Sequence, residues 1–187
     1  MAMHTELWFP SVIWSSVIHI VDNEEVKSWA YEKQKKDQGR TISNFGGWQS
    51  NDIMLGECSA IDKFITHLNN EIKFCTNQVG LPDLELYNIW VNINPTASYN
   101  HLHNHIDSVL SGSYYVDATP EQGNIQFERN DNGEYHIPTN VAQETYYTST
   151  RATYAAKTGA LYVFPGWLKH SVQGNYTETD RISIAFN

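Results

Sequence analysis

The sequence has too few cysteines for a secreted, disulfide-bonded fold. It contains only Cys58 and Cys75 in 187 residues, and two cysteines do not form a disulfide framework. The first residues are not a basic stretch followed by an apolar one, so they do not resemble a signal peptide. No apolar run is long enough to cross a membrane. We therefore expect a cytoplasmic protein that is not associated with a membrane.

Positive charge is also scarce in this chain. Lys and Arg number 12 against 21 Asp and Glu, which gives a formal net charge of −9. General electrostatic binding of nucleic acid requires a basic surface. The basic residues Lys33, Lys35, Lys36 and Arg40 gather near the expected end of a helix, where they complement the helix dipole. We therefore expect no nucleic-acid partner.

Apolar and aromatic side chains are plentiful. Hydrophobic residues make up 41% of the chain, aromatic residues 13% and charged residues 18%, as in a folded globular protein. Flat rings suit the core of a β-sandwich or barrel. The character of the sequence changes once, near Pro82, from mixed and helical to almost entirely β. We expect a single domain over residues 1–187, in which residues 1–81 support a β core formed by residues 82–187.

Two helices are predicted before Pro82. The first begins at Asp22 or Asn23, because either is a suitable N-cap. The second has apolar residues at spacings of three and four, which is typical of a helix with one buried face. These residues are Ile61, Phe64, Ile65, Leu68, Ile72 and Cys75. Ser59 is a plausible N-cap and Gly80 ends the helix, which we expect to pack on the outer face of a sheet.

The rest of the chain reads as short β-strands separated by Gly, Pro, Asn and Asp. The expected strands are residues 86–93, 99–105, 112–118, 124–128, 142–149, 160–164, 170–173 and 181–186. About eight strands with few helices among them predict a mainly β fold, a jelly roll or barrel buttressed by the two helices. The turn-rich segment 43–50 and the polar stretch 129–140 are predicted loops.

A run of histidines forms the densest group of chemically active side chains. His101, His103, His105 and Asp107 occupy alternate positions, and alternate side chains of a strand share one face. Two of these side chains can be ligands on one face of a metal ion, and a distant strand must then supply the third ligand. His170, which follows a Pro-Gly turn, is the candidate. Two histidines and one carboxylate with open positions form the pattern of oxygen-activating non-haem iron.

An arginine and a serine follow His170 about one hairpin later. Arg181 and Ser183 share a strand face. An arginine inside a barrel needs a carboxylate, which its planar fork holds bidentately, and a serine can add a hydrogen bond. No internal acidic partner is obvious, which favours the carboxylate of a ligand. The alternative is a surface ion pair of Arg181 with Asp180 or Glu178.

Together these elements resemble the iron(II)- and 2-oxoglutarate-dependent dioxygenase superfamily, with its His-x-Asp-like element, distal His and Arg-x-Ser. More narrowly, the chain looks like a small group of such oxygenases found in marine bacteria and phages. The stretches that carry this resemblance are Phe9-Pro10 and residues 43–50, 103–115 and 159–187. The resemblance implies a double-stranded β-helix, bound iron(II), 2-oxoglutarate as cosubstrate and a hydroxylase-type reaction.

The resemblance leaves two assignments of the metal ligands open. In one, His103 is the first ligand and His105 takes the place of the carboxylate, which gives an all-histidine triad. In the other, His105 is the first ligand and Asp107 is the carboxylate. His105 and His170 belong to both assignments, and His101 lies outside the ligand set in each. No catalytic side chain is expected beyond the metal ligands, because the iron carries the chemistry.

The resemblance also implies a pocket for the cosubstrate beside the metal. Arg181 and Ser183 would bind the far carboxylate of 2-oxoglutarate, and Tyr99, Asn92 and Tyr115 on flanking strands are expected to line the pocket.

Two loops are candidates for contact with the substrate. One contains Trp48 and the preceding Gly46-Gly47 turn, and the other is the stretch 129–140. We expect dioxygen and an unassigned small molecule or peptide as substrates. A homodimer is among the expected states, since many oligomers are symmetric dimers.

Two other functions fit parts of the pattern. A His-x-His element with a later histidine also resembles a cupin-like jelly roll that binds metal without 2-oxoglutarate. The glutamate that usually follows in cupins is missing, because Val109 and Leu110 stand there, and Arg181 would have no required role. A non-catalytic ligand-binding module is the third possibility, since a fold alone does not establish activity.

Overall fold

The computed structural model describes residues 3–19 and 21–187. The helices are α1 (Asn23–Gln34), α2 (Ser59–Val79) and the short 3₁₀ turns η1 (Pro120–Gln122) and η2 (Gly133–His136). The strands are β1 (Trp14–Val17), β2 (Asn44–Phe45), β3 (Trp48–Gln49), β4 (Ile89–Asn94), β5 (Tyr99–His103), β6 (Leu110–Asp117), β7 (Ile125–Glu128), β8 (Arg151–Tyr154), β9 (Ala160–Pro165), β10 (His170–Val172) and β11 (Arg181–Phe186).

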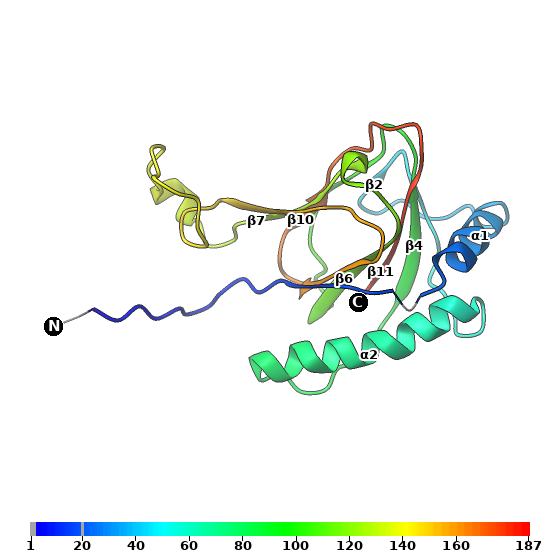
Figure 1. The fold of residues 1–187 in the computed structure, drawn as a ribbon, viewed down its shortest axis with the longest axis horizontal. Coiled ribbons are helices and arrows are strands. Elements are labelled where there is room, and N and C mark those ends of the chain that lie inside the picture. The colour runs from blue at the N-terminus through cyan, green and yellow to red at the C-terminus, as the bar shows by residue number, and fades with distance from the viewer. Residues whose placement is uncertain (1–2, 20) are drawn as a thin grey trace.

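The strands form two antiparallel sheets. The six-stranded sheet has the order β1-β9-β6-β11-β4-β3, and the five-stranded sheet has the order β2-β5-β10-β7-β8. Figure 1 shows the two helices on the side of the six-stranded sheet and the strands β7 and β10 on the other side. The predicted mainly β architecture with two supporting helices is confirmed. In the described ranges, no helix combines the length and apolar character needed to span a bilayer.

Local side-chain chemistry sets where the helices begin and end. Asp22 is the N-cap of α1, and its carboxylate accepts from the backbone N–H of Glu25 at 3.0 Å. The N-cap of α2 is Cys58, so the prediction of Ser59 was wrong by one residue. A glutamate of α1 replaces the missing cap, because Glu25 accepts from the N–H of Ala60 at 3.1 Å. Helix α2 ends at Gly80 in the left-handed conformation, with φ of 74°.

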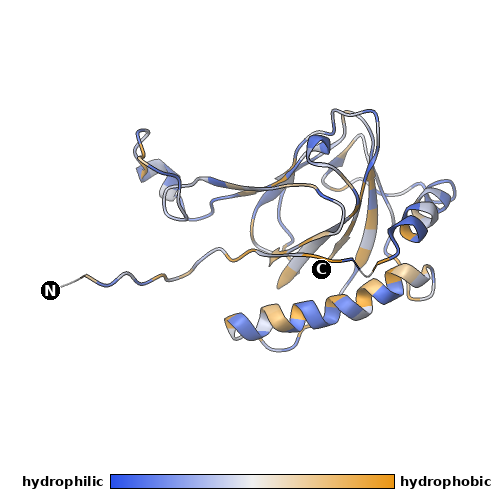
Figure 2. Cartoon of the chain, viewed as in Figure 1, coloured by the Kyte–Doolittle hydropathy of each residue, from blue (hydrophilic) through white to orange (hydrophobic). Residues whose placement is uncertain are grey.

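Helix α2 covers one face of the six-stranded sheet through its apolar stripe. Phe64 is fully buried, and its ring lies 4.9 Å from that of Tyr114 on β6 and 6.3 Å from that of Phe186 on β11. Figure 2 shows hydrophobic and hydrophilic segments alternating along the ribbon of α2, as expected of a helix with one buried face. This packing fixes α2 against the sheet that carries β11 and its arginine.

One predicted strand is absent. Residues 142–149 form turns, and the edge strand of the five-stranded sheet is β8, which begins two residues later. The hydroxyls of Thr145 and Thr148 hydrogen-bond to nearby backbone groups in this segment. Such local bonds compete with a strand ladder. The β-propensity of this stretch was therefore misleading, and the loop after β7 is longer than predicted.

The predicted loop 43–50 contains the two short strands β2 and β3. The first pairs with β5 in the five-stranded sheet, and the second pairs with β4 in the six-stranded sheet. The turn between them, Gly46-Gly47, therefore crosses from one sheet to the other. Gly46 has φ of 70°, a conformation that favours glycine.

Candidate functional site

Three histidines converge between the two sheets. His103 ends β5, His105 follows it by two residues, and His170 begins β10. His103 and His170 are direct partners across the two strands, and their ring centroids lie 4.3 Å apart. One ligand nitrogen from each of the three histidines lies within 4.8 Å of the others. This spacing suits three ligands of a single metal ion.

A β-bulge in β5 decides which residues of this strand face the histidine cluster. His103 pairs with His170 and Asn100 pairs with Val172, so β5 has one more residue than β10 between these pairs. Asn100 and His103 consequently line the same cavity although they are three positions apart in the sequence. The rings of Tyr99 and His101 instead pack together with Phe45 of β2, outside that lining.

Backbone contacts position His105, which lies beyond the end of its strand. Its N–H donates to the carbonyl of Gly166 at 2.8 Å, and the N–H of Gly166 donates to the carbonyl of Val109 at 3.1 Å. A Cβ atom at Gly166 would lie 2.1 Å from the carbonyl oxygen of Ser108. Only glycine permits this approach, so the Pro-Gly turn before His170 also holds the loop that carries His105.

Each histidine has its Nδ1 atom bonded to an oxygen acceptor. His103 Nδ1 lies 2.7 Å from the carbonyl of His101, and His170 Nδ1 lies 3.0 Å from the carbonyl of Leu168. His105 Nδ1 bonds to the Oδ1 atom of Asn187. A carbonyl oxygen only accepts, so Nδ1 carries the proton in each ring. The Nε2 atoms are therefore left with free lone pairs, which is the tautomer that a metal ligand needs.

Burial keeps all three imidazoles neutral. Burial and the neighbouring His103 lower the pKa of His170 to about 3 and that of His105 to about 4. Burial also lowers the pKa of His103. Near neutral pH no proton competes with a metal ion for these nitrogens.

Asp107, one of the two predicted alternatives for the third ligand, lies apart from this cluster. It follows the end of β5 in a turn and lines a second cavity beside Leu68, Ile72 and Phe186, under helix α2. Among the described residues, the group that converges comprises the three histidines alone. The expectation that four alternate side chains point the same way fails for two reasons: the bulge in β5 turns His101 away from the cavity, and Asp107 lies in the turn that follows the strand.

The cavity that contains the histidines extends between the sheets to the start of β11. It is lined by side chains of both sheets, and the residues are Ser43, Gln49, Trp90, Asn92, Asn94, Asn100, His103, His105, Gly112, Ser113, Tyr115, Ile125, Phe164, His170, Val172, Arg181, Ser183 and Ala185. The predicted pocket residues Arg181, Ser183, Asn92 and Tyr115 are therefore together in one cavity, and Tyr99 is outside it.

Arg181 is buried at the far side of this cavity, with 1% of its surface exposed. Its Nη1 atom donates to the carbonyls of Gln122, Gly123 and Gln173. Its Nη2 atom has no hydrogen-bond partner within residues 3–19 and 21–187. Burial lowers the pKa of Arg181 and the neighbouring Tyr115 raises it, but a guanidinium stays charged in proteins. The arginine thus presents a buried positive charge and a free N–H₂ edge.

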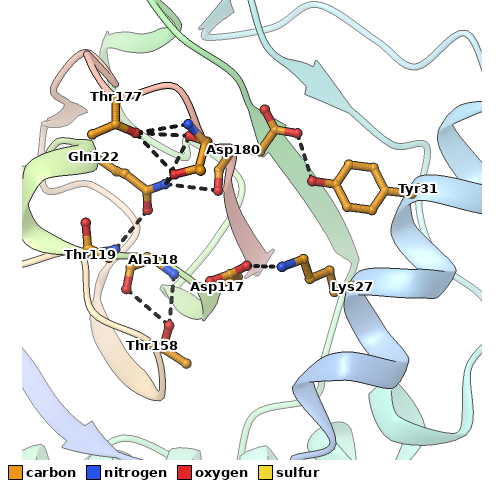
Figure 3. Close-up of polar contacts among 10 residues, drawn as sticks. Lys27, Tyr31, Asp117, Ala118, Thr119, Gln122, Thr158, Thr177 and Asp180 are labelled. Atoms are coloured by element: carbon orange, nitrogen blue, oxygen red, sulfur yellow. Dashed lines mark hydrogen bonds and ion pairs between the residues drawn. The ribbon is translucent and has the colours of Figure 1, made fainter.

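A polar network holds the turn that precedes Arg181 (Figure 3). The buried side chain of Gln122 donates to the carbonyls of Thr179 and Asp180, at 3.0 and 3.1 Å, and accepts from the N–H of Thr119 at 2.8 Å. Tyr31 of α1 donates to the Asp180 carboxylate at 2.8 Å. Asp180 thus faces the helix, and the predicted alternative of an ion pair between Asp180 and Arg181 was wrong.

The two predicted substrate loops occupy different surroundings. Trp48 packs against the core, donates to the carbonyl of Asp37 at 2.9 Å and is outside the cavity lining. The loop between β7 and β8 projects away from both sheets (yellow in Figure 1) and carries exposed Tyr135, Tyr146 and Tyr147.

Sequence reasoning missed two contributors to the site. Gln122 and Asn187 each hold a predicted site residue, Arg181 and His105 respectively. Their only signal in the sequence was position, since one closes a Pro-containing turn and the other follows the Arg-x-Ser strand.

Comparison with known proteins agrees with this geometry. The family model described as "Putative 2OG-Fe(II) oxygenase" matches residues 88–187, which is more than half of the chain. This range contains all three histidines, Arg181 and Ser183. No curated protein matches the chain.

Solved structures with the same fold cover nearly all of the chain. A prolyl-4-hydroxylase from Pseudomonas putida has a TM-score of 0.62 at 16% identity, over 94% of this chain and 91% of that one. The viral collagen prolyl hydroxylase of Paramecium Bursaria Chlorella virus-1 has a TM-score of 0.61 at 13% identity, over 93% of both chains. HygX from Streptomyces hygroscopicus, solved with nickel and 2-oxoglutarate, has a TM-score of 0.60 at 13% identity, over 94% and 82%. These likenesses support the double-stranded β-helix.

Proposed function

The chain belongs to the 2OG-Fe(II) oxygenase family and is an iron(II)- and 2-oxoglutarate-dependent dioxygenase, and we propose that it is a hydroxylase whose iron is held by the three-histidine cluster. The observation that carries this proposal is the combination, in one cavity, of three imidazoles with free Nε2 atoms and a buried arginine with a free Nη2 atom.

The proposed ligands are His103, His105 and His170. Imidazole is a good ligand for iron, and family members with two histidines and a carboxylate provide one negative charge to the metal. Three neutral histidines provide none, so an iron(II) bound here would keep its full positive charge. That charge favours an anionic chelating ligand such as a 2-oxo acid.

Arg181 and Ser183 are the proposed partners of the far carboxylate of 2-oxoglutarate. A buried guanidinium without an acidic partner is costly unless a ligand supplies the opposite charge. Arg181 meets this description, and Ser183 lies on the same strand face, two residues along β11. Asn92 and Tyr115, on the strands that flank β11, complete this side of the proposed pocket.

The chain's own residues hold and shield the reacting centre. Bound iron(II) and 2-oxoglutarate supply oxygen activation, with succinate and carbon dioxide as coproducts. Phe164 packs 4.6 Å from the ring of His170 and Trp90 packs 6.1 Å from that of His105. These aromatic walls limit the access of water, and the Nδ1 bonds keep each imidazole in one orientation.

A small molecule or a peptide is the proposed substrate, with dioxygen as the second. Two of the solved structures described above are named as prolyl hydroxylases, which supports a peptide. The exposed tyrosines of the loop between β7 and β8 are proposed contacts for either class. The cytoplasmic location, the homodimer and the single domain over residues 1–187 stay predictions from the sequence.

The test is anaerobic addition of iron(II) and 2-oxoglutarate to the purified protein. We expect the weak visible charge-transfer band of the iron–2-oxoglutarate complex, followed by succinate formation when oxygen is admitted. His170→Ala should lose both signals, and Arg181→Ala should weaken both by at least tenfold. Gln126→Leu, a change outside the cavity lining, is the control. Metal binding without the band or succinate would contradict the proposal and favour a cupin-like metal site.

A further inference from the structure

A second buried donor without a partner lies beside Arg181. Asn94 is 2% exposed and lines the same cavity. In the described part of the chain, its Nδ2 atom has no hydrogen-bond partner. Nearly all buried side-chain donors in proteins are satisfied. A free amide donor that faces a cavity therefore indicates a missing acceptor.

The two unsatisfied donors belong to residues that face each other across two strands. Asn94 on β4 is the direct partner of Arg181 on β11, so the two side chains project from the same face of the sheet. Both Nδ2 and Nη2 lack partners there. Two N–H₂ groups that project from paired residues into one cavity match the two oxygens of one carboxylate.

The surrounding backbone holds the amide of Asn94 without giving its Nδ2 atom an acceptor. The turn between β2 and β3 packs directly against it, because a Cβ atom at Gly47 would lie 2.6 Å from Nδ2. The carbonyl of Gly47 is already used by the side chain of Asn44, which donates to it at 2.9 Å. The carbonyl of Asn94 accepts from the side chain of Asn175 at 2.9 Å. These contacts hold the amide in place and leave its donor for a ligand.

The acceptor should carry negative charge. Arg181 is buried, and its recorded partners are three neutral carbonyl groups. A neutral acceptor would satisfy the hydrogen bonds but would leave the buried charge without compensation. A carboxylate satisfies both requirements at once.

We propose that Asn94 is a further cosubstrate-binding residue, whose Nδ2 donates to one oxygen of the far carboxylate of 2-oxoglutarate while Arg181 Nη2 donates to the other. This inference rests on the proposed function and extends it. Asn94 then makes the cavity selective for 2-oxo acids that carry a second carboxylate at this distance from the metal. A 2-oxo acid that lacks this carboxylate gains nothing from Asn94.

The experiment compares two ligands on the nickel-loaded protein, in which we expect binding of 2-oxo acids without turnover. Isothermal titration calorimetry gives the dissociation constants of 2-oxoglutarate and of pyruvate, which lacks the far carboxylate. We expect Asn94→Leu to weaken binding of 2-oxoglutarate about tenfold, which corresponds to the loss of one good hydrogen bond to a charged group. Pyruvate binding should stay within about twofold of wild type.

Asn94→Asp provides a second and independent readout. Its carboxylate would pair with Arg181 in place of the ligand, so 2-oxoglutarate binding should fall about a hundredfold while the melting temperature of the ligand-free protein rises. Asn140→Asp, at an exposed position in the loop between β7 and β8, controls for the added charge. The Asn94→Asp variant also carries the test if Asn94→Leu does not fold.

The outcomes separate this inference from the proposed function. Wild-type affinity for 2-oxoglutarate in both Asn94 variants, or an equal loss for both acids, would overturn the role of Asn94 alone. A wild-type protein that binds nickel but neither acid would overturn the proposed function, and the inference with it. Selective loss of 2-oxoglutarate binding in the variants supports both.

Discussion

His105 and Asn187 lie 82 residues apart in the chain, yet Nδ1 of His105 donates a hydrogen bond to Oδ1 of Asn187. The same oxygen accepts from the hydroxyl of Ser111 at 2.8 Å, and the amide nitrogen of Asn187 donates to Oδ1 of Asn88 at 2.9 Å. These bonds fix which end of the amide faces the imidazole. The residue that follows β11 thereby orients a proposed metal ligand that lies beyond the end of β5.

Asn187→Leu should weaken iron(II) binding. The acceptor for His105 is lost, and loss of such a partner of a ligating histidine typically costs 10- to 100-fold in metal affinity. Asn187→Asp keeps an acceptor oxygen and should stay within about threefold of wild type on the same scale. Competition titration with a chromophoric chelator measures both constants. Equal losses in the two variants would show that Asn187 affects metal binding by stabilising the fold and not by its hydrogen bond to His105.

His103 and Asp107 are predicted to respond differently to substitution. The metal lies among the three histidines in the proposal, so His103→Ala should lower metal affinity by about 100-fold or more. Asp107→Ala should leave the affinity within about twofold, because Asp107 lines the cavity under α2. Equilibrium dialysis with iron(II) under anaerobic conditions distinguishes the two results. A large loss in Asp107→Ala would restore the assignment with one carboxylate ligand.

The metal-free protein should lose stability as the pH falls below about 6.5. The pKa of His105 is lowered to about 4 and that of His170 to about 3, so the unfolded chain binds protons in this window before the folded chain does. Stability therefore rises with pH between about 4 and 6.5 and is lost on acidification. Each histidine should contribute roughly 2 kcal/mol between pH 6.5 and pH 5, at about 1.4 kcal/mol per pH unit.

Urea unfolding in the presence of a chelator, at pH 5 and at pH 7, measures this dependence. His170→Asn removes one of the two most strongly shifted groups and should reduce the difference between the two pH values by roughly half. An unchanged difference would mean that His170 is protonated as readily in the folded chain as in the unfolded one.

Gln122→Leu should weaken binding of 2-oxoglutarate more than it affects metal binding. The substitution removes the bonds to the carbonyls of Thr179 and Asp180 that hold the turn before Arg181. Unsatisfied buried carbonyls should also reduce the free energy of unfolding by about 2 kcal/mol. We expect a KM for 2-oxoglutarate raised about tenfold with a smaller change in kcat. Gln126→Leu, which alters a partly exposed glutamine on β7, is the matched control for both measurements.

Much of the fold could be predicted from periodicity and turn chemistry. The apolar spacing that begins at Ile61 predicted α2, and the alternating end of the chain predicted β11. Residues 142–149 misled the prediction because hydroxyl bonds within the segment replace the ladder. These bonds depend on backbone conformation, which composition does not reveal.

The candidate site was predictable as a set of residue types but not as a geometry. His105, His170 and Arg181 could be found from their spacing, and the structure brings them to one cavity. The choice between His103 and Asp107 depended on where β5 ends. Gln122 and Asn187 could not be found, because each acts through a contact between segments far apart in the chain.

The bulge in β5 has a consequence for how relatives should be compared with this chain. It places Asn100 and His103 on the same wall of the cavity at a separation of three residues. A relative without the extra residue would present the equivalent two side chains at a separation of two, in the same positions in space. If such a relative is aligned with this chain at the histidines and without a gap, its residues that face the metal are matched with Tyr99 or His101. The side chains of these two residues lie outside the cavity lining. Superposition of the strands, rather than counting from the histidines, identifies the true counterparts.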